Sequence, residues 1–538
     1  GALIVEVGKT PVQTLKSYAQ ELVEKEYGPD KAAQMDSYVP PPASPPEVFR
    51  DIVVSGNIEV TGGIAFVGGE DRLQVFREYF GEIHESGLVK IQDGSYQIQL
   101  ERTEGELVAA IFGDKGRLKG EASFPLSRIT KNRIAKNQVS PVHLTIRPAT
   151  DGARAKVLSS YSFAKHEFAV EKADTLFSGF DESVAVDGKE LMVEGLERFS
   201  TYQLQVRSPG HWGTRVVGWA GREQEVELFA DRRMVALLDQ AQVPQNLRGL
   251  GVVLGKIEGT TESGRNTLAD VRVELAGAIA EPIYFNNLLI PDKQLTVTGS
   301  NGMFAFVGIP PGVHQVHASV GGERIPVEVF SADYGSVSYV RMQKGQNEWV
   351  PLKVYDPLSG KQNISSRLQV VGEPGAVDVD GEVLFDVQRS DSLIWIESAP
   401  LGRYMLTRQA YPRRSRHFTL PGISLDWLQG LQSEPSSGGG RLNEKRAAVV
   451  GFVEGAGELR NFQVQLGSDA KNLDYKTIYF DRLGRRVEAP IGGGGFAIFD
   501  IEGGMQTVVI VPNAPLRAAT HVIVAEPSVV SVVHQVYR

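Results

Sequence analysis

The residue types that most often carry catalysis or bind metals do not form a recognisable site in this sequence. There is no cysteine, which excludes disulfides, thiolate metal sites and cysteine nucleophiles. His314 and His317 come nearest to a metal-binding pair, but on a strand the side chains of residues i and i+3 point to opposite faces. No histidine, aspartate or serine grouping recurs at a spacing that would converge on one site. We therefore expect no catalytic, cofactor or metal site, and a protein that is not an enzyme.

Two further segments match ligand-binding loops only in part. Asp378 and Asp380 have the spacing with which a calcium loop begins, but a third ligand and the distal bidentate glutamate are missing. A hairpin turn explains this segment better, as it does the similar Asp187-Gly188. The glycines at 492–495 have no lysine, serine or threonine to hold phosphate and magnesium. We interpret both segments as turns.

Two polar loops carry the residues that suit binding. Trp212 stands between glycines in the segment 209–215, where its ring could stack on a sugar or dock against a partner. The alternative is that Trp212 covers the end of its own domain. Arg413, Arg414 and Arg416 concentrate positive charge in an acidic protein, which suits an anionic polysaccharide, a lipid head group or an acidic neighbouring subunit. The alternative for these arginines is a solvated hairpin.

Composition excludes several classes of function. The 538 residues include 56 Lys and Arg against 65 Asp and Glu, for a formal net charge of −9. This acidic excess argues against nucleic acid as a partner, because phosphate neutralisation needs clustered basic residues. No apolar run approaches the roughly 20 residues of a transmembrane helix. A long chain without cysteine is typical of proteins exported from bacteria, where stray thiols mispair, so we expect a periplasmic, cell-surface or extracellular location.

The elements that position these residues are predicted to be almost all β. Short segments such as 271–275 and 462–466 alternate apolar and polar residues and are bounded by turn-forming residues. This pattern is typical of antiparallel β-sandwiches. Helical periodicity is confined to a segment from Pro11 to Tyr27 and a short one from Asp231 to Gln240.

One pattern recurs three times along the chain. Each copy opens with an apolar strand that ends in a glycine, followed by an aromatic pair, a glycine-containing turn with its strand, and a further glycine before a last apolar strand. The interval of roughly 200 residues is too long for a solenoid but suits a pair of domains. The segments between the copies also resemble each other, so the predicted order is A, B, A, B, A. The opening glycines are Gly56, Gly255 and Gly451, and the aromatic pairs are Tyr79-Phe80, Tyr284-Phe285 and Tyr479-Phe480.

The second copy carries three motifs of known repeat families. Gly255-Lys256-Ile257 forms an opening strand, Asn301-Gly302-Met303-Phe304 a turn and strand, and Pro310-Pro311-Gly312 a second turn. With these motifs the segment resembles the carboxypeptidase regulatory-like and collagen-adhesin B-type repeats, although His314 stands where those families prefer tyrosine. The resemblance is good over about 250–341, fair over 447–512 and weak elsewhere. It implies seven-stranded, transthyretin-like sandwiches of the kind that serve as rigid spacers, stalks and adhesive modules on exported proteins.

We therefore expect an all-β chain, a tandem array of about five Ig-like or transthyretin-like β-sandwich domains behind a short N-terminal segment that contains a helix. Residues 1–50 combine a strand, the helix and a proline-rich spacer, which suits contact with another subunit. The alternative is that they fold back onto the first sandwich. The expected domains are 51–138 (A1), 139–246 (B1), 247–344 (A2), 345–444 (B2 with a Ser/Gly-rich linker) and 445–538 (A3).

The sequence thus predicts a non-enzymatic, exported bacterial structural or adhesion protein, a scaffold or stalk. Its expected partners are other protein subunits, including copies of itself joined through the N-terminal segment. One alternative is a glycan-binding module that contacts polysaccharide through Trp212 and the arginines at 413–416. Another is an accessory subunit of a pilus, secretion or envelope machine. Neither a cofactor nor a transmembrane segment is expected.

Overall fold

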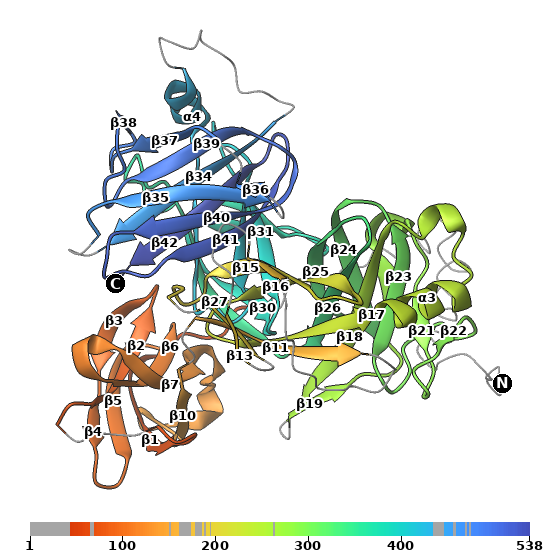
Figure 1. Cartoon of the computed structure of the whole chain (residues 1–538). Coiled ribbons are helices and arrows are strands. Elements are labelled where there is room, and N and C mark those ends of the chain that lie inside the picture. The colour runs from red at the N-terminus through yellow and green to blue at the C-terminus, as the bar shows by residue number, and fades with distance from the viewer. Residues whose placement is uncertain are drawn as a thin grey trace, which may run out of the picture.

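A computed structural model of the chain describes residues 44–64, 69–149, 152–160, 174–177, 185–187, 190–193, 195–261, 264–433, 446–455, 459–468, 471–472 and 475–537. Within these residues the chain is almost entirely β, folded into about five β-sandwich units (Figure 1). The predicted N-terminal strand, helix and proline-rich spacer lie outside the described residues. In the part that is described, no helix is long and apolar enough to cross a membrane.

A1 is one sheet that curls around its own core. Its strands run in the order β3-β2-β6-β7-β10-β1-β5-β4. Leu144 and Ile146 of β10 fill the A1 core, so the A1 sheet extends past the expected limit at residue 138. The strands are β1 (Arg50–Val60), β2 (Arg72–Tyr79), β3 (Glu82–Ser86), β4 (Leu88–Lys90), β5 (Ser95–Arg102), β6 (Glu106–Phe112), β7 (Leu118–Pro125), β8 (Ile134–Ala135), β9 (Gln138–Val139) and β10 (Leu144–Pro148).

B1 and A2 share a sheet. In B1 the elements are β11 (Ala153–Ser160), β12 (Asp174–Phe177), β13 (Ala185–Asp187), β14 (Glu190–Val193), β15 (Thr201–Arg207), β16 (His211–Trp219), β17 (Glu223–Ala230) and α3 (Asp231–Gln240). In A2 they are β18 (Gly251–Thr261), β19 (Gly264–Thr267), β20 (Arg272–Leu275), β21 (Ile283–Phe285), β22 (Pro291–Asp292), β23 (Met303–Ile309), β24 (Gly312–Val320), β25 (Glu323–Ala332) and β26 (Ser336–Lys344). Strand β16 pairs in parallel with β26, which makes one 13-stranded sheet across both units. Strands β20, β24 and β25 form the second layer of A2.

B2 and A3 repeat this arrangement. In B2 the elements are β27 (Asn347–Tyr355), β28 (Ser365–Val370), β29 (Val377–Asp380), β30 (Glu382–Gln388), β31 (Leu393–Pro400), β32 (Thr407–Pro412), β33 (Phe418–Pro421) and α4 (Leu425–Gln432). In A3 they are β34 (Ala447–Gly455), β35 (Phe462–Ser468), β36 (Lys471–Asn472), β37 (Thr477–Phe480), β38 (Arg486–Val487), β39 (Gly495–Ile501), β40 (Gly504–Pro512), β41 (Ala519–Ala525) and β42 (Val530–Tyr537). Strand β32 pairs in parallel with β42, within a nine-stranded sheet.

Each B–A pair is therefore one module, and the two modules share details beyond the strand order. The ion pair of Arg215 with Asp333 (2.8 Å) recurs as Arg408 with Glu526 (2.7 Å). In both modules this pair ties a B strand to the turn before the last A strand. The helix that follows each B unit covers the outer face of the shared sheet, α3 over β18 and α4 over β34.

The modules pack against each other reciprocally. Strand β15 of B1 contacts β41 of A3, while its counterpart β31 of B2 contacts β25, the counterpart of β41 in A2. An apolar cluster at this interface draws on both modules and includes Trp219, Val329, Leu393, Trp395, Met505 and Val522. This is the self-complementary contact of a two-fold dimer, here within one chain. Figure 1 shows B1 and B2 at the centre, A2 and A3 outside them and A1 below.

The glycine that opens each A unit has a packing role. A Cβ on Gly255 would lie 2.0 Å from the Phe304 ring, and one on Gly451 would lie 2.0 Å from the Phe496 ring. In each case the aromatic residue is the cross-strand neighbour of the glycine. The ring occupies the space that any other side chain would need. In A1, Gly56 likewise stands opposite Tyr96.

The predicted aromatic pairs are equivalent in A2 and A3 but not in A1. Tyr284 pairs with Phe304, and Tyr479 pairs with Phe496. The residue at this place in A1 is Val89, opposite Tyr96, whereas Tyr79 ends β2. The alignment of Tyr79-Phe80 with the other two pairs is therefore wrong, because the corresponding A1 strand carries valine instead.

Candidate functional site

Trp212 packs against its own module. It lies on β16 opposite Phe229 of β17, and its half-buried ring contacts the apolar core that B1 shares with A2. This placement matches the alternative in which Trp212 covers its own domain. The ring packs on the edge of the B1 core, and only the part of the ring that does not pack there faces outward.

The three arginines of the predicted basic loop are engaged within the chain. Arg413 is only 2% exposed and its Nη2 lies 2.6 Å from the Glu373 carboxylate. The Nε of Arg414 lies 2.5 Å from Asp391. Strands β32 and β33, which the loop joins, lie in different sheets, so the loop is not the expected hairpin. Its positive charge is used to hold parts of this chain together.

Asp378 and Asp380 also differ from the expected hairpin. Strand β29, which contains them, pairs with β28, whereas the following β30 pairs with β27 in the other sheet. The Asp380-Gly381 turn therefore carries the chain from one layer of B2 to the other. His314 and His317 lie on β24, and within the described part of the chain no group of three or more metal-ligating side chains occurs.

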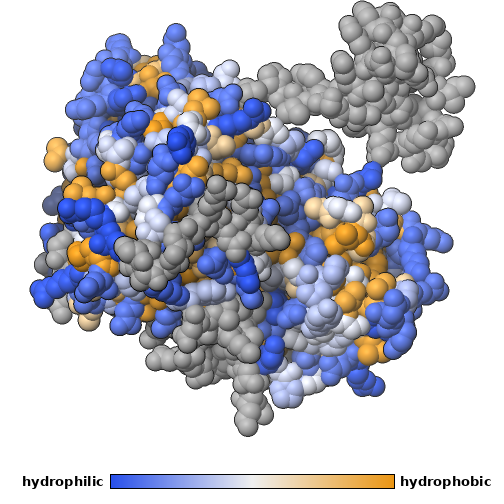
Figure 2. Space-filling view, turned by 90° about the horizontal axis from the view of Figure 1, so that it is seen from above, coloured by the Kyte–Doolittle hydropathy of each residue, from blue (hydrophilic) through white to orange (hydrophobic). Residues whose placement is uncertain are grey.

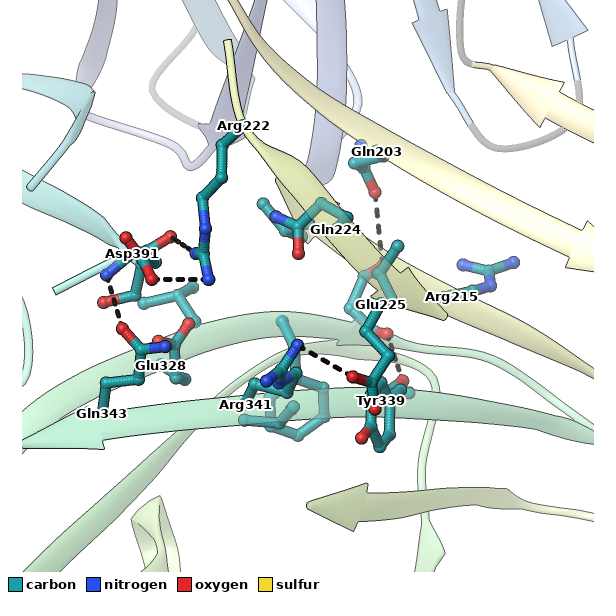
Figure 3. A pocket seen from close by; sticks show the side chains of 18 residues that line it. Gln203, Arg215, Arg222, Gln224, Glu225, Glu328, Tyr339, Arg341, Gln343 and Asp391 are labelled. Atoms are coloured by element: carbon teal, nitrogen blue, oxygen red, sulfur yellow. Dashed lines mark hydrogen bonds and ion pairs between the residues drawn. The ribbon is translucent and has the colours of Figure 1, made fainter. Parts of the chain in front are cut away.

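A polar cavity lies where B1, A2 and B2 meet, and it is the strongest candidate site that the sequence did not indicate (Figure 3). Strands β15–β17 and the turn between β16 and β17 supply Gln203, Arg215, Arg222 and Glu225, strands β25 and β26 supply Glu328 and Arg341, and Asp391 comes from B2. The sequence gives no signal for this cavity, because its polar residues lie at alternate positions of strands that local patterning would place facing solvent.

Ion pairs cross the cavity between units. Arg341 in A2 lies 2.8 Å from Glu258 of its own unit and 3.5 Å from Glu225 of B1. Arg222 of B1 lies 2.5 Å from Asp391 of B2. The backbone N–H of Asp391 donates to Gln343 of A2 at 2.9 Å. Each of the three units is thus bonded to another through this one junction.

Glu328 is a carboxyl of the cavity whose pKa is strongly raised. Burial raises its pKa to about 8, against the opposing effects of a hydrogen bond from Ser392 and the charges of Arg413 and Arg222. Its Oε1 atom has no hydrogen-bond partner among the described residues. A carboxyl with such a pKa can exchange a proton near neutral pH, but catalysis also needs room for a substrate. The cavity measures about 50 Å³, enough for a few water molecules and far below the roughly 300 Å³ of a small-molecule site.

A1 is attached to B1 and B2 through a second set of buried charges. Arg416 of B2 lies 2.7 Å from Glu78 and 2.8 Å from Glu121 of A1. Arg389 of B2 lies 3.4 Å from Glu106 of A1, and Arg198 of B1 pairs with Glu121. The basic loop therefore contacts acids of the first unit of its own chain, and its contact with an acidic neighbouring subunit stays a prediction.

At this contact the pKa values of two carboxyl groups are shifted in opposite directions. Burial tends to raise the pKa of Glu121, but the guanidinium groups of Arg198 and Arg416 outweigh it and lower the pKa to about 2. Burial raises the pKa of Glu106 to about 7, because Arg389 and Arg416 offset it only partly. A sequence signal for this contact exists: Glu106–Phe112 contains an unbroken apolar run, and a strand without alternation is typical of burial on both faces.

A wider groove of about 1780 Å³ runs between A2 and B2. Strand β20 lines it, and a free strand edge there would invite pairing with another chain. The Tyr284 hydroxyl, however, accepts a hydrogen bond from the Val273 N–H at 3.0 Å, and Thr298 bonds the backbone of Val271. Side chains thus cap this edge. On the face seen from above, hydrophobic residues form separate spots among hydrophilic ones (Figure 2).

Comparison with known proteins gives only remote likenesses. No family model and no curated protein matches the sequence. Among solved structures, the chain is similar to the Bacillus anthracis TIE protein, with 8% identity, a TM-score of 0.13, and coverage of 94% of this chain and 77% of that one. It is also similar to the shaft pilin SpaA from Lactobacillus rhamnosus GG (8%, TM-score 0.12, 32% and 98%) and to BcpA, the major pilin subunit of Bacillus cereus (12%, TM-score 0.11, 55% and 100%). Identities and TM-scores this low do not transfer a function to this chain.

Proposed function

We propose that this protein is a non-enzymatic structural component of an exported bacterial assembly, a multidomain β-sandwich scaffold that makes contacts with other protein subunits. The observation that carries the proposal is that buried charged side chains of this protein form ion pairs between its units. At the junction of B1, A2 and B2, and again under A1, buried arginines and carboxylates bridge units instead of lining a pocket of ligand size. At the junction of B1, A2 and B2 these bridges fix the relative positions of the three units, which is what a scaffold requires.

The N-terminal segment is the proposed assembly device, and its removal tests the proposal. The truncation should end at residue 43 and not at 50, because Phe49 packs on the A1 core and its N–H donates to Thr103 at 2.8 Å. We expect the full chain to form larger assemblies than the truncated chain in size-exclusion chromatography with light scattering. If the full chain stays monomeric at every concentration, the assembly role is contradicted, and glycan arrays become the next test.

A further inference from the structure

The outer face of β2, β6 and β7 in A1 has an acidic border around a small apolar centre. Phe76, Val108 and Ala110 form a buried cluster separate from the A1 core. Glu78 and Glu106 are cross-strand neighbours, and Glu121 stands opposite Ala110. All six side chains therefore lie on the same face of the sheet. We call this set the acidic face: Phe76, Glu78, Glu106, Val108, Ala110 and Glu121.

The surface that receives it is formed by arginines of other units. Arg198 comes from B1, and Arg389 and Arg416 come from B2; we call these three residues the arginine surface. Arg416 makes bonds of 2.7 and 2.8 Å to Glu78 and Glu121. Its side chain is 14% exposed, so these charges are largely withdrawn from water and their pairing is specific to the acidic face.

This contact does not depend on chain connectivity. Glu78 and Arg416 are 338 residues apart in sequence, and A1 is joined to B1 only through the short segment between Pro148 and Ala153. Polar groups dominate the contact, since Arg128 also pairs with Glu348 and the Tyr79 hydroxyl donates to Glu382 of B2. Such a composition is typical of interfaces that separate and re-form. An identical A1 from another copy would make the same contacts with no new chemistry.

We propose that the acidic face of A1 binds the arginine surface of a second copy of this chain, so that copies become linked by exchanging A1. The inference rests on the proposed structural role and names a partner for it. The acidic face and the arginine surface are different surfaces, so each copy carries one of each. Two copies that exchange A1 with each other form a closed dimer, and copies that each pass A1 to the next form an open polymer.

The test uses two full-length charge-reversal variants. The first carries Glu78→Arg and Glu121→Arg, and the second carries Arg198→Glu and Arg416→Glu. In each variant alone, like charges face each other both within the chain and between identical copies, so we expect no association through A1 and an enlarged radius of gyration. In an equimolar mixture both exchanged contacts pair opposite charges. We therefore expect the scattering mass of the mixture to be about twice that of either variant alone and to fall back to that value in high salt, which screens the charges.

A chain with all four substitutions is the control for folding, because its reversed charges match within one copy. We expect it to be as compact as the wild type. If the mixture keeps the mass of the separate variants while this control is compact, A1 docks only within its own chain and the exchange is refuted. The exchange is also refuted if either variant alone stays as compact as the wild type. Assembly of the wild type that is lost on removing residues 1–43 would leave the proposed function intact in both cases.

Discussion

The opening glycines show how single residues specify this fold. A Cβ at Gly255 or Gly451 would have to enter an aromatic ring of the neighbouring strand. The sequence reveals the glycines as a repeated feature, but the reason for them appears only once the strands are paired. For the arginines, the sequence predicts the residues but not their partners. The loop at 413–416 is visible as a concentration of charge, but its partners Glu78 and Glu121 lie 338 and 295 residues from Arg416, beyond the reach of local patterns.

Substituting an opening glycine should destabilise its A unit. We expect Gly255→Ala to lower the free energy of unfolding by about 1–3 kcal/mol, the usual cost of overpacking a core. Gly249→Ala is the matched control, because nothing lies within 4 Å of a Cβ there. Urea titration compares the two. Equal unfolding midpoints for both variants would show that the Phe304 ring does not constrain Gly255.

Glu328 should make stability depend on pH. Its pKa is raised to about 8 in the folded protein, from an ordinary value of 4.5. The folded state therefore holds this proton more tightly than the unfolded chain, and the resulting stabilisation is full below pH of about 4.5 and is lost as the pH rises through about 8. Because Glu328→Gln stays neutral, we expect the variant to gain stability relative to the wild type across this range.

Urea titrations at several pH values measure this difference. The control is Glu281→Gln, which changes an exposed glutamate of the same unit. A wild-type minus Glu328→Gln difference that is flat with pH would contradict the assignment of a buried, protonated carboxyl at the junction.

At the scale of elements, local patterning succeeds where an element is regular and fails where tertiary contacts decide. Alternation predicts the β class, and the apolar spacing of Asp231–Gln240 predicts α3, which has those same bounds. Helix α4 is missed because it has only eight residues and contains Gly430, which is unfavourable inside a helix. The parallel pairing of β16 with β26 cannot be read locally. The apolar run at the start of β18 is the one sequence feature that reflects the shared sheet, because Val252 and Val253 face different cores.

Both helices should contribute to stability through the shared sheets. Leu428 is fully buried in α4, and Leu237 is 3% exposed in α3. We expect each to cost about 2–5 kcal/mol of unfolding free energy when changed to alanine. Val235→Ala is the control within α3, because Val235 is 50% exposed, and it should change stability by less than about 0.5 kcal/mol. Similar losses of unfolding free energy for Leu237→Ala and Val235→Ala would show that α3 does not stabilise the sheet by covering its apolar face.

At the scale of the molecule, five units that could form a string are instead folded back on one another. The structure repeats a B–A module, and two modules meet as the halves of a dimer would. Local sequence patterns do not contain this arrangement, because it depends on contacts between residues hundreds of positions apart. The buried ion pairs at the three-unit junction and under A1 hold the arrangement together.

Small-angle X-ray scattering of the full chain at low concentration tests this account most directly. A compact body of 538 residues should have a radius of gyration of about 24 Å, whereas five units of about 13 Å each placed end to end would give about 50 Å. We predict the compact value, with a distance distribution that has a single main maximum. A value near that of the extended array would contradict the packing of the two modules and the docking of A1.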